Sequence, residues 1–440
     1  MTRETAMIRI FIFVFIILFF LGCQNCIICP SSKVEGAKTT TVQTETDKKP
    51  EVQVEAAKPE KPNVQVAQAK TPQNKSKSGK KNKKISKQEQ ELETKKFQGE
   101  RIKELRFELK KTPLFEKWYY SLAEERVRQI YYAAKLLLVE SESKKLFAFD
   151  GKTGIIQWVY TLPESLDFRP EIVKDRLYFL AMAKLYTLDK STGSLLKQTE
   201  LNFIPSSPLC IGDKYIYLGA WDNFLYALDK EDGSVAWRYR IDGIVQGQPV
   251  VSDGLLFFPG TDQKIYAINA ESGYSLNDWG KESRYETRAA NVAGIHAESN
   301  PPSLYIGSVD YNFYSLNRVN GDLRWKFESG GEIRYKPYQT AKTIYFSAEM
   351  IEKKTLFYGL DIQNGDLKTT VENGILFFFV GQFHDFIVRN DKKIVAVSRG
   401  NQKQSLYDFK EFDYFVSNPE ESNLGFIATK DAFIFAVEEK

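Results

Sequence analysis

The chain has 440 residues, about two to three times the length of a common single domain, so it contains several modules or one large repetitive one. Hydrophobic residues make up 42% of it and aromatic residues 14%, with 31 Phe and 23 Tyr. This composition can bury a large core, excludes a wholly disordered chain and favours β structure. Two His and four Cys leave little scope for metal chemistry.

The net charge of +4 is unevenly distributed along the chain. Residues 1–32 carry +1, residues 33–111 carry +9 from 21 Lys and Arg against 12 Asp and Glu, and residues 112–440 therefore carry −6. The basic charge lies in an N-terminal segment, whereas the part able to form a core is mildly acidic. We therefore expect no nucleic-acid partner, despite the basic isoelectric point.

The N-terminus has the pattern of an export signal. Arg3 and Arg9 precede an apolar run of 12 residues, Ile10 to Leu21, which is shorter than the roughly 20 residues of a membrane-spanning helix and fits a secretory signal. Gly22-Cys23 resembles the lipobox of bacterial lipoproteins, which implies that residues 1–22 are removed and that Cys23 is lipidated. The alternative is an uncleaved N-terminal anchor. Both place the protein in the bacterial cell envelope, and the absence of Asp after the cysteine favours the outer membrane, facing the periplasm or the cell surface.

The cysteines suggest no metal centre. Cys23, Cys26 and Cys29 are spaced like the start of an iron–sulfur run, but the fourth ligand is missing and a lipidated Cys23 could not bind metal. Cys210 stands alone in a strand-like stretch and is expected to be a small buried hydrophobic residue. We predict no metal and no cofactor.

Residues 23–112 are predicted to form a lipidated, Lys-rich disordered linker. There is no aromatic residue from Lys33 to Lys96, and Lys70 to Lys87 contains eight lysines and no acid. Such a segment buries too little apolar surface to offset its chain entropy, so it is expected to be a solvated spacer. The alternative is adhesion to anionic lipid or to acidic wall polymer. Within this region, Gln88 to Lys111 could form a short amphipathic helix.

A repeat dominates residues 113–440. Six apolar strands end in Asp or Asn, with Gly four residues later, and two degenerate copies follow. The period averages about 41 residues, the length of a four-stranded propeller blade. The last strand positions of the eight copies are residues 150, 189, 229, 269, 317, 361, 398 and 438.

Each part of the repeat has a structural role. The Asp or Asn side chain can bond the backbone of the following turn, and Gly can take the positive φ that closes it. A Trp four residues later begins the outermost strand and can wedge against the next blade. Lys197, Asn277 and Thr369 replace this Trp in copies two, four and six, so looser contacts are expected there. The structural repeat residues are Trp118, Asp150, Gly154, Trp158, Asp189, Gly193, Asp229, Gly233, Trp237, Gly273, Gly321, Trp325, Asp361 and Gly365.

The ends of the repeat region predict how the ring closes. The eighth copy ends without an outer strand of its own, and residues 115–122 look like an outer strand without a blade. We predict an all-β, eight-bladed propeller of four-stranded blades closed by this N-terminal strand, with seven blades as the alternative. The long interval between copies four and five predicts an inserted loop over residues 277–302.

The segment Ala227-Leu-Asp229-x-x-x-Gly233-x-x-x-Trp237 resembles the tryptophan-docking repeat of the pyrroloquinoline-quinone-like β-propellers. That resemblance implies a propeller over residues 113–440. It also raises the possibility of a quinone-dependent oxidoreductase, but such enzymes use calcium ligands near a catalytic Asp and usually an adjacent cysteine pair, and the sequence has no Cys-Cys. We therefore predict no enzymatic activity and interpret the tryptophans as packing residues.

The combination of a signal, a spacer and a propeller resembles one family of propeller lipoproteins. This family is the B subunit of the outer-membrane β-barrel assembly machinery. This implies a monomeric, membrane-anchored scaffold that binds protein partners of that machinery and has no chemistry of its own. The alternative is a surface or periplasmic ligand-binding or sensor lipoprotein. For either role, the candidate partner-binding residues lie in predicted loops, unless they tuck under the blades: Phe203, Ile204, Ile244, Val245, Tyr335 and Tyr338.

Overall fold

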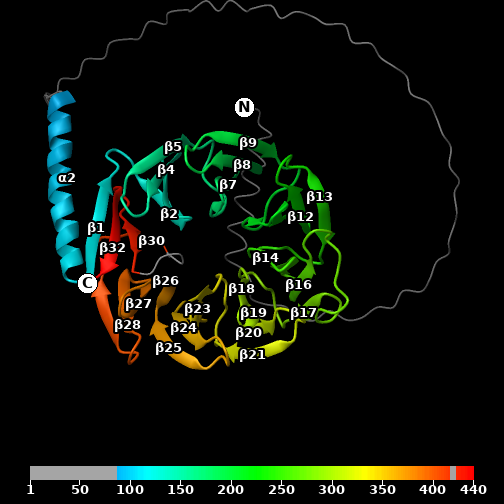
Figure 1. Ribbon diagram of the computed structural model, residues 1–440. Coiled ribbons are helices and arrows are strands. Elements are labelled where there is room, and N and C mark those ends of the chain that lie inside the picture. Colours follow the sequence, from blue (N-terminus) through cyan, green and yellow to red (C-terminus); the bar gives the residue numbers. More distant parts are fainter. Residues whose placement is uncertain (1–86, 417–422) are drawn as a thin grey trace, which may run out of the picture. The chain divides into compact units, whose positions relative to one another are not determined.

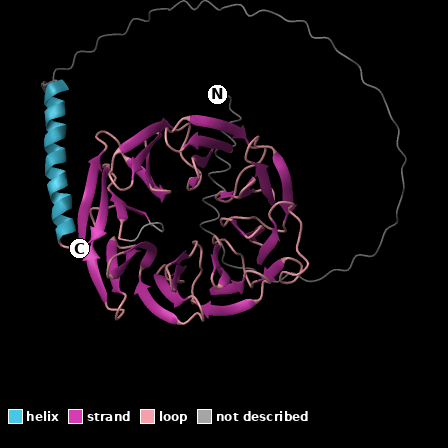
Figure 2. Cartoon of the chain, in the orientation of Figure 1, coloured by secondary structure: helices cyan, strands magenta, loops and turns pink. Residues whose placement is uncertain are grey.

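The computed structural model describes residues 87–416 and 423–440. These residues form one helix and eight four-stranded antiparallel sheets arranged as blades around a central axis (Figures 1 and 2). The all-β, eight-bladed prediction is confirmed, and the seven-bladed alternative is wrong. Copy seven has all four strands of a blade, although its turn lacks the Asp and Gly of the other copies.

The blades follow one another in chain order, and each sheet runs from an innermost to an outermost strand. In that order they are β2 (Val127–Ala133), β3 (Leu136–Ser141), β4 (Lys145–Asp150) and β5 (Ile156–Thr161); β6 (Glu171–Val173), β7 (Arg176–Ala181), β8 (Lys184–Asp189) and β9 (Leu195–Glu200); β10 (Cys210–Ile211), β11 (Tyr215–Gly219), β12 (Phe224–Asp229) and β13 (Val235–Arg240); β14 (Val250–Ser252), β15 (Leu255–Pro259), β16 (Lys264–Asn269) and β17 (Arg284–Glu286); β18 (His296–Ser299), β19 (Pro302–Gly307), β20 (Asn312–Asn317) and β21 (Leu323–Glu328); β22 (Tyr338–Gln339), β23 (Thr343–Glu349), β24 (Thr355–Asp361) and β25 (Leu367–Glu372); β26 (Gly374–Val380), β27 (His384–Arg389), β28 (Lys393–Ser398) and β29 (Gln404–Asp408); and β30 (Tyr414–Val416), β31 (Gly425–Ala428), β32 (Phe433–Glu439) and β1 (Leu114–Ser121).

The eighth blade is built from both ends of the propeller. β1 pairs antiparallel with β32, from Leu114 opposite Glu439 to Ser121 opposite Phe433, and supplies the outermost strand that the eighth copy lacks. Figure 1 shows β1 beside β32, next to the marked C-terminus. The predicted closing strand is therefore confirmed. This pairing leaves β32 without an exposed edge and completes the ring.

Differences in burial explain why the inner and outer strands of a blade have different patterns of apolar and polar residues. The third strands are packed on both faces by neighbouring blades, so they are apolar without alternation; in β12, Leu225 to Leu228 are all buried. The outermost strands contact a neighbour on one face only, and the burial of β13 alternates accordingly. The small residue in the centre of the third strand lies opposite the Trp of the outer strand, as Ala227 does opposite Trp237.

The outer-strand tryptophans join each blade to the next. The Nε1 of Trp158 donates a hydrogen bond of 2.7 Å to the carbonyl oxygen of Lys190 in the following blade. Its ring covers Gly193, which has a φ of +68°, and a Cβ on this glycine would lie 2.5 Å from the indole. Glycine is therefore required there both for its positive φ and for the space that it leaves. Further indole–glycine pairs of this kind are Trp118–Gly154, Trp237–Gly273 and Trp325–Gly365.

The long interval between copies four and five differs from expectation. Residues 277–302 are not a single loop, since they contain β17 and β18. The extra residues lie earlier, between the end of β16 and the start of β17, and they contain Trp279. Trp279 is buried, donates to the carbonyl oxygen of Arg318 at 3.0 Å and packs against Gly321. Copy four thus has a docking tryptophan after all, displaced by the insertion.

Copy two replaces the tryptophan with a different contact to the same turn. The ammonium of Lys197 donates to the carbonyl oxygen of Glu231, at 2.5 Å. Thr199 packs against Gly233, which other copies cover with an indole ring. The lysine therefore keeps the polar part of the blade contact but loses the flat apolar part.

Helix α2 (Lys87–Lys110) lies along β1 on the outside of the ring (Figure 1). Ile102, Leu105 and Leu109 follow helical spacing and are buried in one core cluster with side chains of blades seven and eight. Arg101 forms ion pairs with Glu411 at 2.7 Å and with Asp431 at 3.3 Å, which ties the helix to these blades. The helix ends before Pro113, which cannot continue it.

The helix corrects part of the predicted linker. The sequence predicts a disordered linker over residues 23–112, with a helix as one possibility for its last part. Lys87–Lys110 are in fact helical, and Ile102, Leu105 and Leu109 of this helix pack on the propeller. The predicted signal at residues 1–22, Cys23, Cys26, Cys29 and the linker up to residue 86 lie outside the described residues. Within the described ranges, no helix has the length and apolarity needed to cross a membrane.

Replacement of Trp118 tests the docking contact at the point of ring closure. The W118A variant should lose about 2–4 kcal/mol of unfolding free energy, because it removes the ring over Gly154 and the hydrogen bond from Nε1 to the carbonyl oxygen of Gly151. Urea unfolding followed by circular dichroism measures this loss. The matched control is W221A, which removes an indole that is 53% exposed and should change stability by less than about 0.5 kcal/mol. Equal effects of the two variants would contradict the docking role.

A pair of substitutions tests the attachment of α2. The L105D variant places a carboxylate in an apolar site where the leucine is fully buried, so the helix should detach and the melting temperature should fall. F107D changes a neighbouring residue that is 60% exposed and should leave both unchanged. Hydrogen exchange of residues 100–110 reports detachment directly. Retained protection in L105D would show that the helix does not depend on this contact.

Candidate functional site

The loops of the propeller form two rims with different contents. One, here called the connection rim, contains the connections between blades and the turns between second and third strands. These loops hydrogen-bond to each other: the amide of Trp221 donates to the carbonyl oxygen of Ile204, and that of Thr261 to the carbonyl oxygen of Ile244, both at 3.0 Å. The opposite, or motif, rim contains the turns with the repeated Asp and Gly. The connection rim includes residues 162–170, 182–183, 201–209, 220–223, 241–249, 260–263, 287–295, 308–311, 329–337 and 350–354.

Four of the candidate partner-binding residues lie in connection-rim loops of blades three and four, with different exposure. Ile204 is 60% exposed, whereas Phe203 is half-buried and stacks on Tyr226 with 3.8 Å between ring centroids. Ile244 is half-buried. Val245 is buried in the core cluster of blades three and four, so the prediction that its side chain contacts a partner is wrong; the loop turns inward there.

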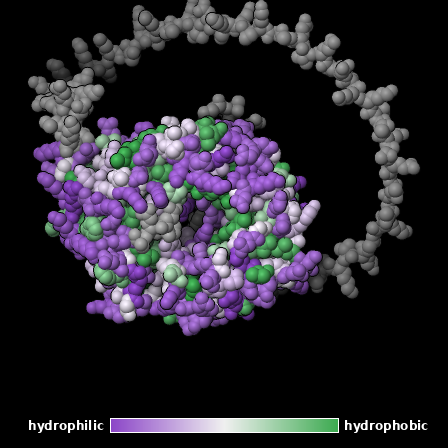
Figure 3. Space-filling model, viewed as in Figure 1, coloured by the Kyte–Doolittle hydropathy of each residue, from purple (hydrophilic) through white to green (hydrophobic). Residues whose placement is uncertain are grey.

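The same rim has further exposed hydrophobic side chains that the sequence did not indicate, among them Met182, Trp221, Tyr311 and Ile351. Met182 is 55% exposed and Trp221 is 53% exposed, and Trp221 is bonded through its backbone to Ile204. Both lie in turns between second and third strands, and the exposure of a turn side chain cannot be read from the sequence. Figure 3 shows that hydrophobic surface on the face in view occurs in patches around the ring, separated by hydrophilic residues, with a hollow at the centre.

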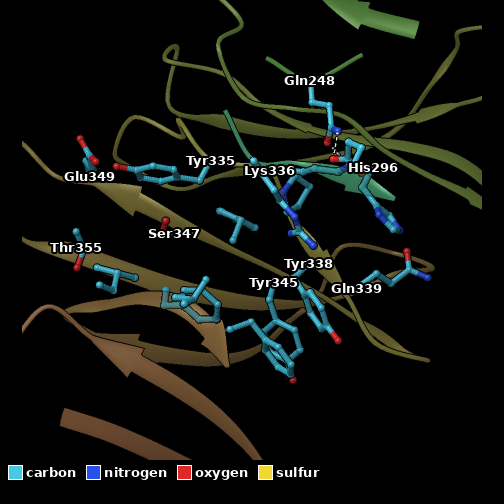
Figure 4. A pocket seen from close by; sticks show the side chains of 18 residues that line it. Gln248, His296, Tyr335, Lys336, Tyr338, Gln339, Tyr345, Ser347, Glu349 and Thr355 are labelled. Carbon is cyan, nitrogen blue, oxygen red and sulfur yellow. Dashed lines mark hydrogen bonds between the residues drawn. The ribbon is translucent and has the colours of Figure 1, made fainter. Parts of the chain in front are cut away.

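The remaining two candidates, Tyr335 and Tyr338, line a cavity of about 700 Å³ that opens on the connection rim. Its far wall is aromatic: Tyr338 stacks on Phe377 at 4.2 Å, and Tyr345 lies 4.8 Å from the same ring. Figure 4 shows Gln248 and Lys336 on one side of the cavity and Tyr338 and Tyr345 on the other. Tyr335 and Tyr338, which were predicted only as loop residues, therefore both line this cavity.

A repeated backbone position supplies the polar groups of this cavity. Arg169, Gln248 and Lys336 each stand immediately before the Pro that leads an inner strand, in blades two, four and six. Gly294 occupies the corresponding position in blade five, and a Cβ there would lie 3.2 Å from that of Lys336 and 3.3 Å from that of Gln248. The residue before each of these prolines is the signal in the sequence that could have indicated the cavity.

These side chains form a hydrogen-bonded chain across the channel. The amide nitrogen of Gln248 donates to the Glu171 carboxylate at 2.8 Å, and Lys336 donates to the amide oxygen of Gln248 at 2.9 Å. Three alternate blades are linked in this way. Arg169 donates to the carbonyl oxygen of Tyr132 at 2.7 Å.

The channel shifts the ionisation of these groups, because protein surrounds them even where water reaches them. Desolvation raises the pKa of the Glu171 carboxyl, against the opposing effect of the Arg169 and Lys336 charges. Desolvation lowers the pKa of the Lys336 ammonium, and the charge of Arg169 lowers it further. Two basic side chains, Arg169 and Lys336, thus lie near the single carboxyl group of Glu171. The arrangement can accept a small anion.

A second cavity of about 870 Å³ reaches the motif rim and shares His296, Tyr338, Gln339 and Tyr345 with the first. It contains Asp385, a buried carboxyl that accepts a hydrogen bond from Tyr345 at 2.7 Å and whose pKa is raised by desolvation. In residues 87–416 and 423–440, no group of three or more His, Cys, Asp and Glu side chains is placed to hold a metal ion. Cys210 is buried, as expected, and desolvation raises its pKa to about 12.

Comparison with known proteins fits this architecture. Residues 115–207 and 204–297 each match the family model described as outer membrane protein assembly factor BamB. The chain is an eight-bladed propeller that resembles BamB over these residues. The resemblance predicted from the tryptophan-docking repeat is thereby confirmed.

One solved structure shares the fold at low sequence identity, and a second is similar over part of its length. The computationally designed Ika8 protein is 12% identical, with a TM-score of 0.57 over 72% of this chain and 98% of that one. BamB from Moraxella catarrhalis is 15% identical, with a TM-score of 0.43 over 70% of this chain and 84% of that one. No curated protein matches the chain significantly.

The His296 side chain predicts a pH dependence of stability. Burial, and then the charge of Lys336, lower its pKa to about 4, below the value near 6.5 of an unfolded chain. Between these values the unfolded state binds a proton that the folded state does not, so His296 makes stability fall as pH decreases from about 6.5 to about 4. The H296Q variant should lose less stability over this interval in urea titrations. Parallel curves for the two proteins would contradict the assignment.

Proposed function

We propose that the chain is a non-enzymatic, membrane-anchored scaffold that binds a protein partner during outer-membrane protein assembly. The observation that carries this proposal is the match of residues 115–207 and 204–297 to the BamB family model, in a chain whose described part is an eight-bladed ring with exposed hydrophobic side chains on its connection rim. The lipobox-like Gly22-Cys23 supports anchoring in the bacterial envelope.

The connection rim offers a partner protein a surface that is already ordered before binding. Ile204 and Trp221 are both more than half exposed, and their loops are held by the hydrogen bond between their backbones. Phe203 is fixed beneath them by its stack on Tyr226. A large side chain held by a rigid loop loses little entropy on binding, which is a property of residues that dominate protein interfaces. No proton or group transfer is needed for this function.

The central cavity supports the ligand-binding alternative. Its volume of about 700 Å³ lies in the range of small-molecule sites, and Arg169 and Lys336 favour an anion. A sensor lipoprotein would use this cavity, whereas an assembly scaffold would use the rim. The two roles therefore predict different effects of rim substitutions.

A tagged pull-down from gently solubilised membranes, read by mass spectrometry, tests the assembly role. The full-length chain should recover subunits of the barrel-assembly machinery, and replacement of both Ile204 and Trp221 by Ser should reduce that recovery at least about tenfold, a loss of roughly 1.4 kcal/mol. The C23A variant should reduce recovery by removing the anchor.

The matched control is Tyr274→Ser, which changes a side chain that is 77% exposed on the motif rim and should leave recovery unchanged. Recovery of wall polymer or of a single surface protein without the machinery would favour the ligand-binding alternative. Recovery that is equal for the rim double variant and the control would contradict a partner site on the connection rim.

A further inference from the structure

Every blade of a propeller presents one unpaired strand edge to the outside. The eight outermost strands are β1, β5, β9, β13, β17, β21, β25 and β29. An unpaired edge exposes backbone N–H and C=O groups that can pair with another chain, and native proteins commonly block such edges with charged side chains. The charge of each outer strand therefore indicates whether its edge is protected or open.

Seven of the eight outer strands carry at least one charged side chain, and β5 carries none. The charged residues of the other seven are Glu116 and Lys117 in β1, Lys197 and Glu200 in β9, Arg238 and Arg240 in β13, Arg284 and Glu286 in β17, Arg324, Lys326 and Glu328 in β21, Lys368 and Glu372 in β25, and Asp408 in β29. The sequence of β5 is Ile-Gln-Trp-Val-Tyr-Thr, which is rich in residues with high β propensity.

Side chains in and next to β5 are also exposed to solvent. Ile155, just before the strand, is 61% exposed and Val159 is 48% exposed, while Trp158 between them turns inward to cover Gly193. Gln157 and Thr161 are exposed and uncharged. Figure 3 shows hydrophobic surface where Figure 1 places β5. Both the backbone edge and the side chains beside it are therefore suited to an added strand.

The backbone of β5 is paired on one side only. Among the described residues, its ladder runs to β4, from Lys145 opposite Thr161 to Phe149 opposite Ile156. The strand is continuous to Thr161, and Pro163 follows soon after it, which limits an added strand to about the length of β5. Helix α2 packs on β1, the outer strand of the preceding blade, and leaves Ile155 and Val159 exposed.

We propose that the outer edge of β5 binds an extended strand of a partner protein, uncharged and with aliphatic and polar residues in alternation, by adding it to the sheet of the first blade. Main-chain hydrogen bonds supply the affinity, and the side chains of Ile155 and Val159 select aliphatic residues on the neighbouring face. The proposal extends the scaffold function, but its test needs no assembly machinery, so either can fail alone.

A flexible strand fits this edge better than a second copy of the ring. The ring curves away on both sides of β5 (Figure 1), so two rings meeting there would touch along little more than one strand each. An extended segment has no such steric limit and can follow the edge along its whole length.

A labelled peptide of alternating Val and Thr, about as long as β5, tests the proposal with the purified full-length chain. Fluorescence anisotropy should show binding to the unchanged protein, and hydrogen exchange of residues 156–161 should slow on peptide addition. The V159K variant places a charge at the edge and should weaken binding at least about tenfold. The same peptide with all of its backbone nitrogens methylated should not bind, because neither of its edges then keeps N–H groups that can pair with β5.

The matched control is L195K, since Leu195 is 47% exposed at the start of β9, a strand that already carries Lys197 and Glu200. This variant should bind the peptide like the unchanged protein. Equal binding by V159K, or slowed exchange elsewhere than in β5, would overturn the proposal. Self-association of the unchanged chain that V159K abolishes, measured by sedimentation, would identify a second copy as the occupant and would also overturn it.

Discussion

Pairing of β1 with β32 is the contact on which the rest of the structure depends. A propeller blade is apolar on both faces in its middle strands, so each blade is stable only between two neighbours. If the ring opened at one place, the sheet of β30 to β32 would lose its outermost strand and an apolar face would meet water. Helix α2 strengthens this point, since Leu105 and Leu109 are buried in the core cluster that includes Phe433 and Phe435 of β32. The closing strand is thus held by backbone bonds on one side and by a helix on its face.

The contacts between blades show how a repeat tolerates change. The indole ring combines a hydrogen bond with a flat apolar surface over a glycine of positive φ, and copy two separates these two parts between Lys197 and Thr199. Copy four recovers the whole contact through Trp279, although an insertion has displaced it along the chain. The geometry of the turn, more than the spacing in the sequence, is therefore what the repeat preserves.

The sequence predicted the fold because its signal is repeated and local. The number of blades and the closure followed from three features, namely apolar strands at a regular period, the Asp or Asn and Gly of the turns, and the incomplete first and last blades. The docking role of Trp279 was not predicted, because the insertion changes the expected spacing from Gly273. The cavity could not be predicted, since Arg169, Gln248 and Lys336 lie in three different blades and converge only through the ring. Val245 was misplaced because a β-branched residue in a loop gives no sign of the direction in which the loop turns.

Completion of the eighth blade also constrains the order of folding. Lys117 of β1 and Glu438 of β32 are ion-paired although 321 residues separate them in the chain. Blades one to seven can each assemble from consecutive residues. In contrast, β1 pairs with β32, which is synthesised after all of them. Until then the nascent protein holds an unpaired strand and a helix with an uncovered apolar stripe near its N-terminus, and such non-local pairing is intrinsically slow. A chain of this topology therefore cannot close its ring until its last strand is available, whatever the state of the first seven blades.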